Sequence, residues 1–248
     1  MIKLFITDLD GCMSMPFELP NWDALNEIRA LNELSQSDPT VPPITICTGR
    51  PLPYAEAIHQ WMGMRLPFLF ESGGGMYDAQ SNSLTWHSLF TEKRLEDIQS
   101  VKEFLQKECV SKFDETIPEF AKHTDAGLIN PDPKKIEALL PLVESFVQEK
   151  YPNLEVHYTD VSINVISKAT NKGEGIKMLC KQLGLGLLET AYIGDTGGDV
   201  PALKIVGKAF APSNAKEVAK HVAEVAPFEA TEAVLYAYKK VIEFNRTV

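Results

Sequence analysis

Short apolar runs alternate with longer segments of helical periodicity over the first 78 residues. The runs at 4–6, 44–47 and 68–70 are rich in β-branched and aromatic residues, which is typical of buried strands. Between them, apolar residues recur every three or four positions over 22–34 and 55–62, and this spacing predicts two helices. Such alternation of strand and helix favours a parallel sheet with helices packed on its faces.

The pattern changes after Asp78 and returns after Lys168. Long amphipathic helices are predicted at 91–109 and 133–150, with strands at 84–88, 120–129, 154–158 and 161–167. The strand and helix alternation then resumes, with a helix at 173–184, strands at 191–193 and 209–211, and helices near 200–206 and after Asn214 and Thr231. We therefore expect an α/β core made of residues 1–78 and 169–248, interrupted by an α+β insert at 79–168.

Two carboxylates follow the first predicted strand, in the segment Asp8-Leu9-Asp10-Gly11. Ligands of open α/β sheets bind beyond the carboxyl ends of the strands, so both acids are expected where such folds keep their chemistry. Paired carboxylates suit a hard divalent cation, and they also suit a nucleophile and a general acid or base. Taken alone, the same segment is equally typical of a turn that ends a strand.

Three further polar segments fall at predicted strand ends or helix starts. Thr48-Gly49-Arg50 offers a hydroxyl and backbone N–H groups that suit phosphate oxygens. Lys172 precedes a helix, where anions are favoured, and Gly194-Asp195 to Asp199 adds two acids in a glycine-rich loop. Each segment alone is a common turn or a solvated surface feature, but the four in this order point to one site.

Together the four segments resemble the motifs of the haloacid dehalogenase superfamily of phosphohydrolases. They are most similar to the branch with a large cap between the second and third motifs, which includes Cof-type, sucrose-phosphatase-like and mannosyl-phosphoglycerate-phosphatase-like enzymes. The resemblance extends from Asp8 to about Asn214 and implies a Rossmann-like core, with 79–168 as a cap that selects the substrate. One departure is Gly198, where many relatives carry Asn, and it leaves the outer ligands of a metal open.

The resemblance implies hydrolysis of a phosphomonoester through an aspartyl-phosphate, with Asp8 as nucleophile and Asp10 as general acid and base. Mg²⁺ would be held by Asp8, the backbone carbonyl of Asp10 and Asp195, with Asp199 close by. The implied substrate is a small phosphorylated metabolite, either a sugar phosphate or a phosphoglycerate derivative.

Phosphate binding and substrate contacts are implied for a further set of residues. Thr48 and Gly49 would bind phosphoryl oxygens, and Lys172 would offset the charge of nucleophile and phosphate. Candidate substrate contacts are Arg50, Ser72, Gly73, Lys122, His123, Asn164 and Asn214. A structural role is the alternative for each, and Asn214 with Glu217 also fits a helix capping box.

Two other functions use the same residues. A phosphomutase employs the same pair of acids but returns the phosphoryl group to the product, and release of phosphate from a monophosphate would separate the two reactions. A ligand-binding module without catalysis is the third alternative. It is disfavoured because the motif acids, Thr48 and Lys172 are all present.

Composition and charge narrow the class of partner and the compartment. The net charge of −10 and the absence of a basic stripe argue against nucleic acid and anionic membranes as partners. No apolar run approaches the ~20 residues of a membrane span, and the first residues lack a signal-peptide pattern. The four cysteines at 12, 47, 109 and 180 have no ligand spacing, so we expect free thiols and a cytoplasmic location.

Overall fold

In the computed structural model, which describes residues 1–248, five parallel strands form the main sheet in the order β12-β11-β10-β1-β2. They are β1 (Leu4–Thr7), β2 (Ile44–Ile46), β10 (Thr190–Ile193), β11 (Lys208–Ala211) and β12 (Glu224–Val225). All four residues of β1 are buried, because this central strand is covered by helices on both faces. The predicted parallel α/β sheet is therefore confirmed.

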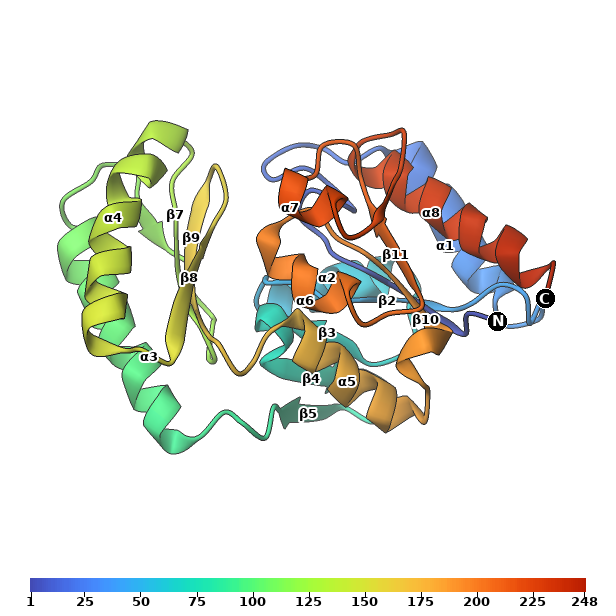
Figure 1. Ribbon diagram of the computed structural model, residues 1–248, viewed down its shortest axis with the longest axis horizontal. Coiled ribbons are helices and arrows are strands. Elements are labelled where there is room, and N and C mark those ends of the chain that lie inside the picture. The colour runs from blue at the N-terminus through green and yellow to red at the C-terminus, as the bar shows by residue number, and fades with distance from the viewer.

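Alternate side chains of β1 enter two separate apolar cores. Phe5 packs with α1 (Trp22–Leu34), α2 (Leu52–Trp61) and α8 (Ala230–Asn245) on one face of the sheet. Leu4 and Ile6 pack on the other face with α5 (Lys172–Leu183), α6 (Val200–Leu203) and α7 (Glu217–Lys220). This arrangement, seen in the lobe to the right of Figure 1, follows from the two-residue period of a strand.

A second, antiparallel sheet lies beside β2. It contains β3 (Phe68–Phe70), β4 (Gly75–Asp78) and β5 (Ser83–Trp86), and the turn η1 (Glu71–Gly73) joins the first two. A single parallel bridge between Cys47 and Leu69 links this sheet to the main one.

The strand β5 falls within the range 79–168 that the sequence assigned to the insert, yet it pairs with β4. The reason is apolar packing, since the Trp86 ring meets Phe70 edge-on at 5.5 Å and holds the hairpin on the first lobe. The chain therefore leaves this lobe only after Trp86.

Two helices and a four-stranded antiparallel sheet form the second lobe, on the left in Figure 1. The helices are α3 (Glu92–Phe104), which continues as the π-helical η2 (Leu105–Val110), and α4 (Pro133–Lys150). The sheet has the order β6 (Ile117–Pro118), β7 (Ala126–Ile129), β9 (Ser162–Ser167) and β8 (Leu154–Tyr158). The helices cover one face, and the other face is turned toward the first lobe. The strand predicted at 120–129 covers only 126–129, and the preceding residues form a loop between the lobes.

The remaining short elements are η3 (Leu187–Glu189) and η4 (Gly197–Asp199). All four cysteines are buried and unpaired, as the sequence predicted. None of the helices combines the length and the apolar character that crossing a membrane requires.

Candidate active site

The strand register brings three of the predicted segments to one edge of the main sheet. Thr7, the last residue of β1, lies opposite Ile46 of β2 and Ile193 of β10. Because these strands are parallel and end together, the residues that follow them meet at the carboxyl edge. Asp8, Thr48 and Asp195 are therefore neighbours although they are far apart in sequence.

Lys172 lies between two buried carboxylates. Its Nζ is 2.7 Å from Asp8 Oδ2 and 2.6 Å from Asp199 Oδ1, and the lysine is only 5% exposed. Burial alone would lower the pKa of Lys172, but the carboxylates of Asp199 and Asp8 outweigh this effect and raise it. The ammonium group is thus a fixed positive charge. Lys172 is the first residue of α5, and the side chain of Asn171 caps this helix by accepting from Glu174 N, which holds the start of the helix in place.

The oxygens of Asp199 are fully used within the protein. Oδ1 accepts hydrogen bonds from Lys172 and from the Tyr192 hydroxyl, and Oδ2 accepts from the N–H groups of Asp195 and Thr196 and from Thr196 Oγ1. This side chain shapes the loop after β10 and holds Lys172 in place.

Asp195 has a buried carboxylate oxygen, Oδ1, that receives no hydrogen bond. One oxygen each from Asp8, Asp195 and Asp199 lies within 4.8 Å of the others. Burial, followed by the charges of Asp199 and Asp8, raises the pKa of Asp195 well above its usual range. Gly11, with φ +73°, makes this approach possible, because a Cβ there would lie 2.1 Å from Asp195 Oδ2.

The carboxylate of Asp8 is held by one partner on each oxygen. Oδ2 faces Lys172, and Oδ1 accepts from the N–H of Leu9 at 2.7 Å. Burial raises the pKa of Asp8 to about 7, Lys172 opposes this shift, and Asp199 adds to it. Asp8 and Asp199 share one lysine and Asp195 lies close to both, so acids outnumber bases in this cluster and the pocket favours a cation.

The residues present suit Mg²⁺. All three side-chain donors are carboxylate oxygens, as a hard cation requires, and no His or Cys belongs to the cluster. The free Oδ1 of Asp195 is the acceptor that such an ion would satisfy. The donor set therefore fits the metal that the sequence implied.

Asp10 points toward Arg50. The guanidinium donates to both carboxylate oxygens, from Nε at 2.6 Å and from Nη2 at 2.7 Å. Behind them, the hydroxyl of Thr48 accepts from the N–H of Arg50, and no protein acceptor is found for the N–H of Gly49. The loop 48–50 thus keeps one backbone donor, the Gly49 N–H, available for a ligand.

Several candidate substrate contacts lie in the interface between the lobes. Lys122 is 1% exposed in its side chain, and its Nζ contacts Glu119 Oε2 at 2.7 Å, Asn164 Oδ1 at 2.7 Å and Asp125 at 3.2 Å. Glu119 in turn places Oε1 4.0 Å from Arg50 Nη1. Among these side chains, Glu119 is the one that approaches the core, through Arg50.

His123, Ser72 and Gly73 have packing roles in this structure. The His123 ring packs against Trp86 in a tilted arrangement, with a centroid distance of 4.4 Å. Ser72 Oγ lies near Gly49, and Gly73, with φ +87°, packs against the start of α5, where a Cβ would lie 2.8 Å from Asn171 O. These two residues therefore connect the phosphate-binding loop with the helix that carries Lys172.

Asn214 does not form the predicted capping box, because the N-cap of α7 is Lys216 and has no side-chain bond. Its amide instead donates to Gly11 O, and its Oδ1 accepts from Ala230 N. The residue ties the first acid loop to the start of α8, so both ends of the amide are occupied.

The structure also brings in residues that the sequence reading missed. His157 of β8 packs on the glycine loop, and a Cβ on Gly198 would lie 3.3 Å from its Nδ1. The hydroxyl of Tyr192, in the apolar strand β10, donates to Asp199. A tyrosine within an apolar run could have indicated this contact, because a buried phenol needs a hydrogen-bond partner. Glu71 and Glu119 belong to no apolar repeat, so no sequence pattern predicted their contacts.

A family model described as haloacid dehalogenase-like hydrolase matches residues 102–237, more than half of the chain. The chain belongs to this family and is an enzyme of it, as the motifs predicted.

Similar proteins of about the same length carry phosphatase names. The phosphoglycolate phosphatase of Methanopyrus kandleri is 28% identical over 246 residues, covering 98% of each chain. That of Thermoplasma volcanium is 25% identical over 224 residues, covering 90% of this chain and 91% of the relative. These names support the phosphatase class.

Solved structures share the fold. A Thermoplasma acidophilum protein aligns with a TM-score of 0.77 at 20% identity, covering 97% of this chain and 98% of its own. The sucrose-phosphatase of Synechocystis, solved with sucrose and phosphate, aligns with a TM-score of 0.71 at 17% identity and the same coverage. The predicted Rossmann-like core of a haloacid dehalogenase-type hydrolase is therefore confirmed.

Proposed function

We propose that the chain is a Mg²⁺-dependent phosphomonoester hydrolase that acts on a small phosphorylated metabolite through an aspartyl-phosphate. The observation that carries this proposal is the Asp8 carboxylate, buried at a strand end and held between Lys172 and the N–H of Leu9. A buried, oriented carboxylate beside a fixed cation suits attack on phosphorus, because the cation offsets the charge that both reactants bring together.

In the first half-reaction, an oxygen of Asp8 forms a bond to phosphorus, and the bond to the leaving oxygen breaks. Asp10 gives its proton to that oxygen. The N–H of Gly49 and the hydroxyl of Thr48 bind phosphoryl oxygens, and Lys172 stabilises their charge. When bound to Asp8, the Asp10 carbonyl and Asp195, Mg²⁺ supplies further charge neutralisation.

In the second half-reaction, Asp10 takes a proton from a water molecule as that water attacks phosphorus. The bond to Asp8 breaks, and inorganic phosphate leaves. Asp10 is paired with Arg50 in this structure, so a substrate that engages Arg50 would free the carboxylate for both proton transfers.

We further propose that residues 87–168 form the cap and select the leaving group. Glu119 reaches into the interface opposite Arg50, so the cap presents an acceptor and the core presents a fixed cation. Hydroxyl groups of a sugar would donate to Glu119, and a carboxylate of a phosphoglycerate derivative would bind Arg50. These are the two substrate classes that we favour, and the names of the relatives support hydrolysis over a mutase reaction.

The test is a phosphate-release screen with Mg²⁺ over hexose 6-phosphates, 2-phosphoglycolate, 3-phosphoglycerate and p-nitrophenyl phosphate. Asp8→Asn keeps the shape but removes the nucleophile, so we expect a loss of about a thousand-fold or more with unchanged folding. Asp23→Asn, an exposed change on α1, is the matched control. Undiminished turnover by Asp8→Asn would refute the covalent mechanism, and isomer formation that outpaces phosphate release would favour a mutase.

A further inference from the structure

We propose that Glu71 is a positioning residue that docks the cap segment Glu119–Asp125 on the core and thereby determines which leaving groups are accepted. This inference rests on the proposed phosphatase function. The side chain of Glu71 contacts none of the side chains that we assign to the reaction, so it would act through the segment that it holds.

One oxygen of Glu71 gathers the cap segment. Its Oε2 accepts hydrogen bonds from His123 N at 2.8 Å, Thr124 N at 2.5 Å and Thr124 Oγ1 at 2.8 Å. Glu71 is 3% exposed, so these bonds form away from water. Hydrogen bonds to a charged acceptor are the strongest polar contacts in proteins, and three on one oxygen hold the segment firmly.

The backbone around Glu71 belongs to the phosphate-binding region. Its N–H donates to Arg50 O, and the N–H of Ser72 donates to Thr48 O. Glu71 and Ser72 have φ of +47° and +55°, a strained conformation for residues with a Cβ. This backbone conformation directs the Glu71 side chain toward the cap, while the Glu71 N–H remains bonded to Arg50 O. The position of the cap segment is therefore coupled to the loop 48–50.

Close packing confirms the contact from the core side. Thr124 lies so near Gly74 that a Cβ on the glycine would be 2.0 Å from Thr124 Oγ1. Beside it, the His123 ring packs against Trp86 of β5. The segment is therefore seated on the turn that follows β3.

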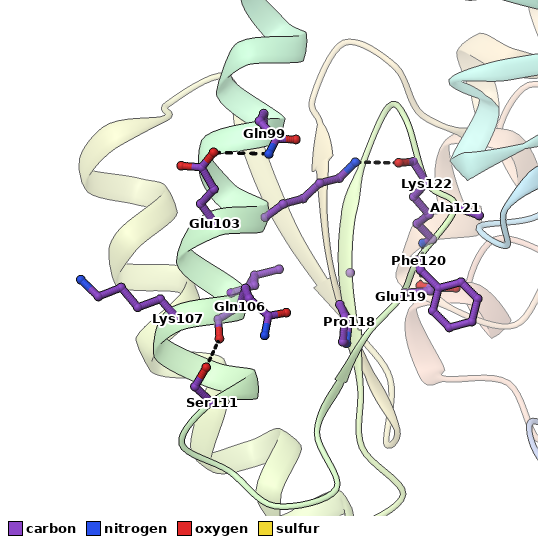
Figure 2. A pocket seen from close by; sticks show the side chains of 13 residues that line it. Gln99, Glu103, Gln106, Lys107, Ser111, Pro118, Glu119, Phe120, Ala121 and Lys122 are labelled. Atoms are coloured by element: carbon purple, nitrogen blue, oxygen red, sulfur yellow. Dashed lines mark hydrogen bonds and ion pairs between the residues drawn. The ribbon is translucent and has the colours of Figure 1, made fainter.

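Behind the segment there is a cavity instead of an apolar core. The space has a volume of about 680 Å³ and is lined by residues of α3, of η2 and of the segment 118–122 (Figure 2). Only three of its 13 lining residues are hydrophobic, and Lys102 spans it to donate to Lys122 O. Because little apolar packing supports the segment from this side, its position depends on polar ties, of which Glu71 supplies the most.

The docked segment fixes the side chains that face the substrate. Lys122, next to the docked residues, binds Glu119 and Asn164, and Glu119 then lies opposite Arg50. A loss of the docking at His123 and Thr124 would therefore move Glu119. A small aryl phosphate does not need the cap contact, so its hydrolysis should depend little on Glu71.

The experiment compares Glu71→Gln with wild type on p-nitrophenyl phosphate and on each hexose 6-phosphate, 2-phosphoglycolate and 3-phosphoglycerate. We expect kcat/KM for the best of these metabolites to fall about 10- to 100-fold, through KM, because charged hydrogen bonds are lost. The aryl phosphate should change by less than about three-fold. Gly74→Ala, which pushes Thr124 away without changing charge, should give the same pattern. Glu33→Gln and Gly186→Ala, at positions with no close partner across the interface, are the controls.

Hydrogen exchange measured by mass spectrometry provides a readout that does not use turnover. In Glu71→Gln, amides within 119–127 should exchange faster, while those of β1 and β10 stay unchanged. Equal losses on metabolite and aryl phosphate, or unchanged exchange in 119–127, would overturn the positioning role. If wild type releases phosphate from none of the compounds, the proposed function fails instead, and the exchange result still decides the docking.

Discussion

Asp125 carries a charge that the folded protein tolerates poorly, so its replacement should stabilise the protein at high pH. The residue is 1% exposed at the interface between the lobes, and its Oδ1 receives no hydrogen bond. Lys122 lies 3.2 Å away, but Glu71 and Glu119 face the same space. Burial raises the pKa of Asp125 from 3.8 to about 7, Lys122 opposes the shift, and the two glutamates add to it.

The sign of the pH dependence follows from this raised pKa. Below pH ~4 the carboxyl is protonated in both folded and unfolded chains and contributes nothing. As the pH rises toward about 7, the unfolded chain ionises first, and the folded state loses stability. The difference of about three units corresponds to about 4 kcal/mol at pH 8, of which about 2–3 kcal/mol is lost between pH 5 and pH 8.

Asp125→Asn keeps the shape and removes the charge, so we expect it to raise the melting temperature at pH 8 by about 5–10 °C more than at pH 5. The assay is thermal unfolding of wild type and variant at pH 5, 6, 7 and 8. Asp23→Asn, an exposed carboxylate on α1, serves as control and should not change the slope. Parallel curves for Asp125→Asn and wild type would show that the carboxylate is not destabilised by burial.

Three other changes test the site. Exhaustive chelation should abolish phosphate release and Mg²⁺ should restore it, since the donor set is made of oxygens; full activity after chelation would contradict this. Gly11→Ala should lower kcat by about a hundred-fold or more, because its Cβ would lie 2.1 Å from Asp195 Oδ2, and a near-normal melting temperature would exclude unfolding as the cause. Gly198→Asn should weaken cap docking and raise KM, because a Cβ there would lie 3.3 Å from His157 Nδ1 and the rest of the Asn side chain would need further space; adding His157→Ala should restore KM, and no recovery would assign the defect to the loop itself.

The core of the site was predictable because its residues follow apolar runs directly. Asp8, Thr48 and Asp195 each come within two residues of a buried strand, and the strands end in register. In a parallel sheet this is enough to place them together. The helix that begins at Lys172 was equally visible from its apolar spacing, which predicted a helix at 173–184, whereas its Asn171 cap was not predicted.

The contacts between the lobes could not be read from the sequence. Glu71 and Thr124 are 53 residues apart, and no periodicity links them. His157 meets Gly198 because the face of the cap sheet that the helices leave uncovered is turned toward the core. The strand β4 was also missed, because glycines at 73–75 look like a turn, whereas Gly75 begins a strand under the ring of Phe70. Long-range packing decided each of these outcomes.

The preference for a cation that we propose rests on the chemistry of the site and does not depend on the family resemblance. Asp8 and Asp199 share the single ammonium of Lys172, and Asp195 lies beside them with a buried oxygen that receives no hydrogen bond. A phosphate group would add still more negative charge, and the net charge of −10 gives no help from the rest of the molecule. Burial, followed by the neighbouring carboxylates, raises the pKa values of Asp8 and Asp195, so both groups are costly to ionise together in this pocket. A divalent ion on the free Asp195 oxygen would offset this cost, and we therefore expect metal binding to precede phosphate binding.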